Sequence, residues 1–194
     1  PVASPLSVHN FSIPKGVETL KEIPAASLGL NPGRFPCRLE VLEGVLNLKN
    51  IVFRAYPGKI EAEDFKEAHD ADSQNQGNAY RPGEAVDIQA CNEGGFNLGW
   101  VQDGEWLEYE AEARRAGTFD LRIRYASDTG GGPLRLSLDG KALGDFPAPP
   151  SGGWQDWKDL EIKGLPLPAG KHRLKVEILK GGLNLNYFLF VPAP

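Results

Sequence analysis

The sequence predicts an all-β protein built around a two-sheet sandwich, and three observations support this. The chain of 194 residues contains 16 prolines and 23 glycines, a composition typical of strands joined by turns. Its apolar residues alternate with polar ones over short runs, whereas the 3.6-residue period of an amphipathic helix is almost absent. The length suffices for one ordinary domain with about 50 residues to spare.

The strands are expected in the second half of the chain. Residues 105–113 (EWLEYEAEA) alternate and precede a turn at RRAG. Residues 118–127 and 134–140 also alternate and are joined by the turn cluster DTGGGP, which predicts a β-hairpin. Residues 167–179 and 184–190 predict a further strand pair. Several short strands at this spacing are typical of a two-sheet sandwich.

An internal repeat changes the expected domain organisation. Aligned without gaps on residues 151–190, residues 14–53 give about a dozen identities, which indicates a duplication. We therefore expect residues 1–53 to be the C-terminal half of a β-sandwich, residues 54–58 to be a linker, and residues 59–191 to be a complete module.

The half module poses a physical problem, because half a sandwich cannot bury both faces of its strands. We expect residues 1–53 to pair with a region absent from this chain or with a second copy of the protein, so that the protein self-associates. A start at Pro1 without methionine suggests a processed or excised fragment.

Composition also limits the partners. The net charge of −5 leaves no basic stripe of the kind that neutralises phosphates, so nucleic acid is not an expected partner. No apolar run approaches 18 residues, so a membrane is not expected either. Cys37 and Cys91 could pair or could remain two buried thiols.

The sequence offers little support for catalysis. A glycosidase needs a pair of carboxyl groups that flank the scissile bond. The chain has enough acidic residues for such a pair, but no motif singles any of them out; they are Asp87, Asp103, Glu105 and Glu108. No nucleophile motif or catalytic metal motif accompanies the three histidines. We therefore expect a binding module rather than an enzyme.

A sugar ring presents an apolar face of C–H bonds and a rim of hydroxyls, so a binder needs flat aromatic area and planar hydrogen-bonding groups. Trp154 in SGGWQDW lies beside two glycines that let the backbone approach a ligand closely. The repeat has Val17 at this position, which suggests that Trp154 is not required for folding. Trp157 leads into a strand and is expected in the core.

Two glutamates raise the question of a metal. Glu61 and Glu63 are two residues apart in EAEDF, so on a strand their carboxylates face the same way and repel unless a cation lies between them. Such oxygen ligands favour calcium. The alternative is that both side chains simply face water.

Six segments together carry a resemblance to a known family. In chain order they are IEAEDF, GGFNLGWVQDGEWLEYE, AGTFDLRIRYAS, GGWQDW, LPAGKHRLKV and GGLNLNYFLF. This pattern resembles family 6 carbohydrate-binding modules and covers nearly all of residues 59–191. The resemblance implies a jelly-roll β-sandwich of the galactose-binding-like type, without catalytic activity, that holds polysaccharide near the catalytic domain of a glycoside hydrolase. It also implies a secreted or extracellular protein.

The resemblance implies roles for several residues. Trp154 and Trp100 would form opposite walls of a sugar-binding slot at the loop end of the sandwich, and Asn184 and Asp87 would bind sugar hydroxyls. For Asn184 a turn residue bonding its own backbone is the alternative, and for Asp87 a solvated surface carboxylate. Trp106 would either build a second cleft on a sheet face or serve packing.

The resemblance also implies a structural calcium ion that ties the first strand to the last, held by Glu61 and Glu63 with Asn186 as a further ligand. The family more often has Asp at the position of Asn186, so the site would lose one negative charge and weaken. The segment YRPGEAVDIQACNEGGFNLGW looks like the version of the family found beside β-glucan hydrolases. We expect β-1,3-linked or mixed-linkage glucan as the ligand, with xylan, cellulose and agar as alternatives, and a protein-interaction sandwich as the rival class.

Overall fold

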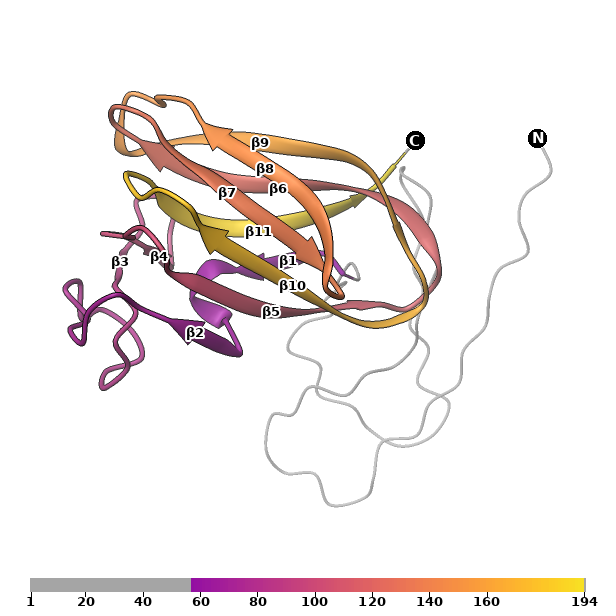
Figure 1. The fold of residues 1–194 in the computed structure, drawn as a ribbon, viewed down its shortest axis with the longest axis horizontal. Helices are drawn as coiled ribbons and strands as arrows, with labels where there is room; N and C mark the ends of the chain where they lie inside the picture. Colours follow the sequence, from indigo (N-terminus) through magenta and orange to yellow (C-terminus); the bar gives the residue numbers. More distant parts are fainter. Residues whose placement is uncertain (1–56, 194) are drawn as a thin grey trace, which may run out of the picture. The chain divides into compact units, whose positions relative to one another are not determined.

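The computed structural model describes residues 57–193, which form two antiparallel β-sheets packed as a sandwich (Figure 1). In spatial order the first sheet contains β3 (Ile88–Ala90), β4 (Phe96–Leu98), β11 (Asn184–Pro192), β6 (Gly117–Ser127) and β9 (Gly153–Leu167), and β1 (Lys59–Glu61) also pairs with β11. The second sheet contains β2 (Glu67–His69), β5 (Trp106–Ala113), β10 (Gly170–Ile178), β7 (Gly131–Leu138) and β8 (Lys141–Ala148). The predicted all-β sandwich of the jelly-roll type is confirmed.

Outside the strands, the described residues contain one short 3₁₀ helix, η1 (Ala62–Asp64), and no α-helix. No helix in residues 57–193 is long and apolar enough to cross a membrane.

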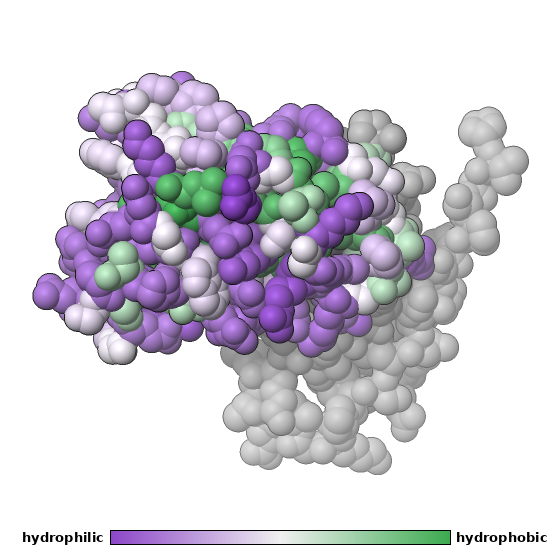
Figure 2. Space-filling view, in the orientation of Figure 1, coloured by the Kyte–Doolittle hydropathy of each residue, from purple (hydrophilic) through white to green (hydrophobic). Residues whose placement is uncertain are grey.

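The hydrophobic core lies between the two sheets and follows the alternation of the sequence. In β10, Leu174, Val176 and Ile178 are buried, whereas Arg173 is exposed on the outer face. The rings of Tyr109 in β5 and Phe188 in β11 meet across the core with centroids 4.8 Å apart. Each such side chain stabilises the fold by about 1.5–3 kcal/mol through burial. Figure 2 shows a mostly hydrophilic face with hydrophobic residues in a band across its middle.

Both predicted strand pairs are wrong, although the strands themselves exist. β6 pairs with β9 and β11, whereas β7 pairs with β8 and β10, so the segment DTGGGP carries the chain from one sheet to the other. β10 and β11 likewise lie in different sheets. The true hairpin joins β7 to β8 through Asp139 and Gly140, which have φ of 50° and 77° and fit a two-residue turn with left-handed backbone.

This alternation between sheets places many connections together. The loops β6–β7, β8–β9 and β10–β11 lie at one end of the sandwich with the long segment from β2 to β5, on the left in Figure 1. The turns β7–β8 and β9–β10 lie at the opposite end. We call the first of these the loop end.

The predictions for residues 1–53 concern the half module and self-association, and they lie outside the described residues. The same holds for Cys37 and for most of the linker at 54–58. Cys91 is buried, and burial raises the pKa of its thiol. Its pairing with Cys37 stays an open prediction.

Candidate functional site

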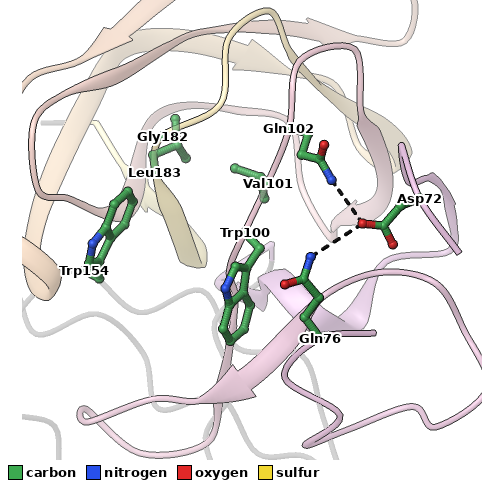
Figure 3. A pocket seen from close by; sticks show the side chains of 8 residues that line it. All are labelled: Asp72, Gln76, Trp100, Val101, Gln102, Trp154, Gly182 and Leu183. Atoms are coloured by element: carbon green, nitrogen blue, oxygen red, sulfur yellow. Dashed lines mark hydrogen bonds between the residues drawn. The ribbon is translucent and has the colours of Figure 1, made fainter. Parts of the chain in front are cut away.

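A hollow of about 500 Å³ opens at the loop end of the sandwich. It brings together residues from the segment after β2, the loop after β4, the start of β9 and the loop before β11. The lining residues are Asp72, Gln76, Trp100, Val101, Gln102, Trp154, Gly182 and Leu183 (Figure 3). In Figure 3 the indoles of Trp154 and Trp100 lie on either side of the hollow. That they form the walls of a sugar-binding slot, as the family resemblance implies, stays a prediction.

Trp154 is the second residue of β9 and is 48 % exposed. The turn before it is held by Ser127 and Ser151, whose backbone and hydroxyl groups exchange hydrogen bonds of 2.8 Å. Gly152 has a φ of +120°, a backbone conformation that side chains rarely adopt. Gly152, two residues before Trp154, therefore shapes the turn that brings the indole to the rim.

Trp100 follows β4 and is 46 % exposed. Its φ of 48° lies in the left-handed region, which is uncommon for a bulky residue and is found mainly at turns and at functional sites. The preceding Gly99 donates its N–H to the carbonyl of Asp87 at 3.0 Å. The strained turn thus starts from an anchored backbone and directs a large apolar ring toward solvent.

A polar cluster adjoins Trp100 and was not predicted from the sequence. The carboxylate of Asp72 accepts hydrogen bonds from the side-chain amides of Gln102 at 3.1 Å and Gln76 at 3.5 Å (Figure 3). Because these amide nitrogens point at Asp72, the amide oxygens remain available as acceptors for hydroxyl groups. The run DADSQNQG, rich in turn-forming polar residues, was the signal that could have indicated a loop of this kind.

Asn184 lies beneath the hollow rather than on its rim. Its side chain is 2 % exposed, and its amide donates to the carbonyl of Trp154 at 2.7 Å. A turn residue bonding its own neighbouring backbone is therefore not what the structure shows. Asn184 braces the backbone that presents Trp154, and direct contact with sugar stays a prediction.

Asp87 is buried behind the polar cluster and does not line the hollow. One carboxylate oxygen accepts the backbone N–H of Gln76, and the other is buried without a partner among the described residues. Burial raises the pKa of Asp87. The expectation of a solvated surface carboxylate is thus wrong, and a sugar contact for Asp87 stays a prediction.

Glu105 supports the same segment from a second point. It is buried, and its carboxylate accepts the backbone N–H of Ala71 at 3.4 Å. Burial raises the pKa of Glu105 to about 7. Two buried carboxylates, Asp87 and Glu105, therefore hold the segment that carries Asp72 and Gln76.

The two remaining tryptophans lie outside the hollow. Trp106 is half-buried on the outer face of the second sheet, where the Lys175 ammonium lies 4.8 Å from the ring centroid. Its role in a second cleft stays a prediction. Trp157 lies at the edge of the first sheet and donates its indole N–H to Asn92 at 2.7 Å. It is only partly buried, so the expected core position for Trp157 is wrong.

The predicted calcium ligands lie at the junction of β1, η1 and β11. β1 ends at Glu61, so Glu63 belongs to η1 and not to a strand as expected. The charge of Glu61 contributes to the raised pKa of Glu63. Burial is the larger cause and brings that pKa to about 7, and one oxygen of Glu63 is buried without a hydrogen-bond partner within residues 57–193.

Other side chains already contact part of this junction. Lys59 lies 2.8 Å from Glu61, and the Asn186 amide nitrogen donates to Glu93 at 3.0 Å. Within residues 57–193, no three acidic, histidine or cysteine side chains are arranged to hold a metal ion. A calcium ion here would therefore draw on the Asn186 amide oxygen and on backbone carbonyls, and the unpartnered oxygen of Glu63 is the feature that fits it.

Comparison with protein families matches residues 61–192 to the family described as "Carbohydrate binding module (family 6)". Among curated proteins, an α-agarase from Alteromonas agarilytica is 34 % identical over 94 residues, which is 45 % of this chain and 6 % of that enzyme. This chain thus corresponds to only a small part of that relative's length.

Solved structures of similar modules agree with the family match. The C-terminal family 6 module of a laminarinase from Zobellia galactanivorans has a TM-score of 0.56 at 28 % identity, covering 69 % of this chain and 97 % of that one. A module of lichenase 5A from Cellvibrio mixtus, solved with cellotriose, has a TM-score of 0.57 at 25 % identity. The match covers 72 % of this chain and 100 % of that module. A β-1,3-glucan-binding module from Bacillus halodurans has a TM-score of 0.52 at 26 % identity. The match covers 68 % of this chain and 93 % of that module.

Proposed function

Because this chain belongs to family 6 of the carbohydrate-binding modules, we propose that it binds a neutral polysaccharide in the hollow between Trp100 and Trp154. The observation that carries the proposal is the pair of indoles, each about half exposed, on the rim of a hollow of about 500 Å³. Aromatic area exposed to this extent is not used by the core, and it matches the apolar face of a sugar ring.

The chemistry of the lining supports a neutral ligand. Asp72 is the single charged side chain among the residues that line the hollow. Buried Asp87 and Glu105 stand behind it, so the surroundings of the hollow are acidic. A sulfated or uronate-rich polysaccharide would meet like charge there, whereas hydroxyl groups would meet the amide and carboxylate acceptors.

We favour β-1,3-linked or mixed-linkage glucan as the ligand. Support comes from the similarity to the modules of a laminarinase and of a lichenase and to a module that binds β-1,3-glucan. Agar is the second candidate, because the curated relative at 34 % identity is an α-agarase. In either case the module would keep an attached glycoside hydrolase close to its insoluble substrate, as part of a secreted enzyme.

Titration calorimetry against laminarin, lichenan, xylan, cello-oligosaccharides and agarose oligosaccharides tests the proposal. We expect a dissociation constant of about 10 μM to 1 mM for one of these classes of glycan. Binding should be weak because only two aromatic side chains stack on the ligand and water competes for hydrogen bonds with its hydroxyls. Trp154→Ala should abolish measurable binding and leave the circular dichroism spectrum and melting temperature nearly unchanged. Near-wild-type affinity in this variant would exclude the hollow as the binding site.

We also propose that a structural calcium ion binds where β1 meets β11, held by Glu61, Glu63 and Asn186. The buried, unpartnered oxygen of Glu63 supports this, since a buried carboxylate needs either a proton or a cation. The ion would supply charge neutralisation between the first and last strands and no chemistry toward the glycan.

A further inference from the structure

A second hollow of about 500 Å³ adjoins the tryptophan slot. Its lining consists of Val101, Gln102, Asp103, Thr129, Gly130, Lys180, Gly181 and Gly182. Val101, Gln102 and Gly182 line both hollows. The two therefore form one continuous depression, which passes over the backbone of Gly181 and Gly182 at the loop end.

The ridge between the two hollows is held by several loops. Asp103 accepts the N–H of Gly181 at 2.8 Å, Ser127 donates its hydroxyl to the carbonyl of Gly182, and Gly132 donates its N–H to the carbonyl of Lys180 at 2.9 Å. A side chain at Gly181 would place its Cβ 2.2 Å from the carbonyl oxygen of Val101. The ridge is thus a low, fixed surface that a ligand can cross without first ordering a loop.

The second hollow differs chemically from the first. It contains no aromatic side chain, so it offers no wall for stacking. It offers instead the hydroxyl of Thr129, the ammonium of Lys180 and the carboxylate of Asp103. Lys180 makes no ion pair with any residue in 57–193, so its three donors are available to ligand hydroxyls.

We propose that the second hollow is a further subsite, in which Thr129 and Lys180 bind the sugar residue next to the one stacked between Trp100 and Trp154. This rests on the proposed binding of glycan in the tryptophan slot. The ligand is then a stretch of at least two neutral sugar units that crosses the Gly181–Gly182 ridge, with Gln102 placed to contact both units. One sugar unit stacks on the tryptophans of the slot, and the hydroxyls of the adjoining unit form hydrogen bonds in the second hollow.

Length-resolved titration tests the subsite. Wild-type protein is titrated with the monosaccharide and the disaccharide of the laminari series (glucose, laminaribiose) and of the neoagaro series (galactose, neoagarobiose), and the same is done with a Thr129→Val, Lys180→Gln double variant. We expect wild-type affinity to rise at least fivefold from monosaccharide to disaccharide, because only the disaccharide reaches the second hollow. The double variant should lose about fivefold in affinity for the disaccharide and less than twofold for the monosaccharide. Lys141→Gln, an exposed lysine at the start of β8 outside both hollows, is the matched charge control and should bind like wild type.

The outcomes separate this inference from the proposed function. If the double variant binds the disaccharide as wild type does while Trp154→Ala binds neither length, the subsite is wrong and the slot stands. An affinity that does not depend on length also overturns the subsite. If neither series binds wild-type protein at millimolar concentration, the slot assignment for these glycans fails and the subsite fails with it. Melting temperatures of all variants check that each remains folded.

Discussion

The loop end and the outer faces of the sheets use tryptophan in opposite ways. At the loop end Trp100 and Trp154 are 46 % and 48 % exposed on the rim of a hollow. On the sheet faces Trp106 lies under the Lys175 ammonium, and Trp157 donates its indole N–H to a neighbouring side chain. An aromatic ring is available to a ligand only where no other part of the protein already occupies its face or its polar group.

The two ends of the sandwich differ in the same sense. At the loop end, polar groups such as Asp72 and Gln102 line an open hollow. At the opposite end, His172 is buried and bridges two turns, with its Nδ1 2.7 Å from the Asp139 carboxylate and its Nε2 2.8 Å from the Pro168 carbonyl. The loop end should therefore govern binding and the rest of the sandwich should govern stability, and three measurements can test this division.

The largest expected effect comes from removing either stacking wall, and Trp100→Ala is the second such variant beside Trp154→Ala. Removing one stacking wall should weaken binding of the preferred glycan at least about 30-fold, equivalent to about 2 kcal/mol, while the melting temperature changes little because Trp100 is already 46 % exposed in the folded protein. Titration calorimetry measures the affinity. The paired variant is Trp106→Ala, which should bind within twofold of wild type and melt lower, because it loses buried area and the contact with Lys175. Weak binding by Trp106→Ala would instead support a second cleft on the sheet.

An intermediate effect is expected from calcium removal. A ligand that binds only the folded state at about ten times its dissociation constant stabilises by about 1.4 kcal/mol, so chelation with EDTA should lower the melting temperature by about 5 °C. Scanning calorimetry with and without added calcium measures this. Glycan affinity at low temperature should not change, because Glu61, Glu63 and Asn186 do not line the hollow.

Glu63→Gln provides the control for this measurement, since it keeps the shape of the side chain and removes the charge that holds a cation. Its melting temperature should no longer respond to calcium. An unchanged melting curve on chelation of wild-type protein, shown by elemental analysis to be free of metal, would remove Glu63 and Glu61 as ligands.

The smallest expected effect concerns His172 and pH. Both ring nitrogens face acceptors, so both must donate, and the Asp139 carboxylate raises the pKa of His172 above its ordinary value of 6.5. A raised histidine pKa stabilises the fold fully below pH 6.5, and this contribution is lost as the pH rises through the folded-state pKa. Asp139→Asn should therefore cost about 1 kcal/mol at pH 6 and less at pH 9.

Urea unfolding of the two proteins at each pH measures this difference, and glycan affinity should be equal in both, because His172 lies at the end opposite the hollow. Asparagine keeps an oxygen for the Arg173 N–H, which Asp139 accepts at 2.8 Å, so the comparison isolates the charge. A stability difference that grows with pH would show that His172 is neutral in the folded protein.

The sequence by itself determined the fold class, several of the strands and the exposure of Trp154. Alternation is a local property, since it records which face of a strand is buried, and it correctly placed β5, β6 and the buried residues of β10. The loop setting of Trp154 and its absence from the repeat, where Val17 stands, likewise predicted an indole that the core does not use.

Only the tertiary structure decided which strands pair and which loops meet. A turn-rich segment such as DTGGGP looks the same whether the next strand returns beside the last one or crosses to the other sheet, because pairing depends on contacts between segments far apart in the chain. For the same reason the sequence did not show that Asp72 would meet Gln102, that Asp87 would be buried, or that Lys180 and Thr129 would line the same hollow. The hollows are made by loops whose positions follow from the crossing of strands between two sheets, and no local pattern of residues records that arrangement.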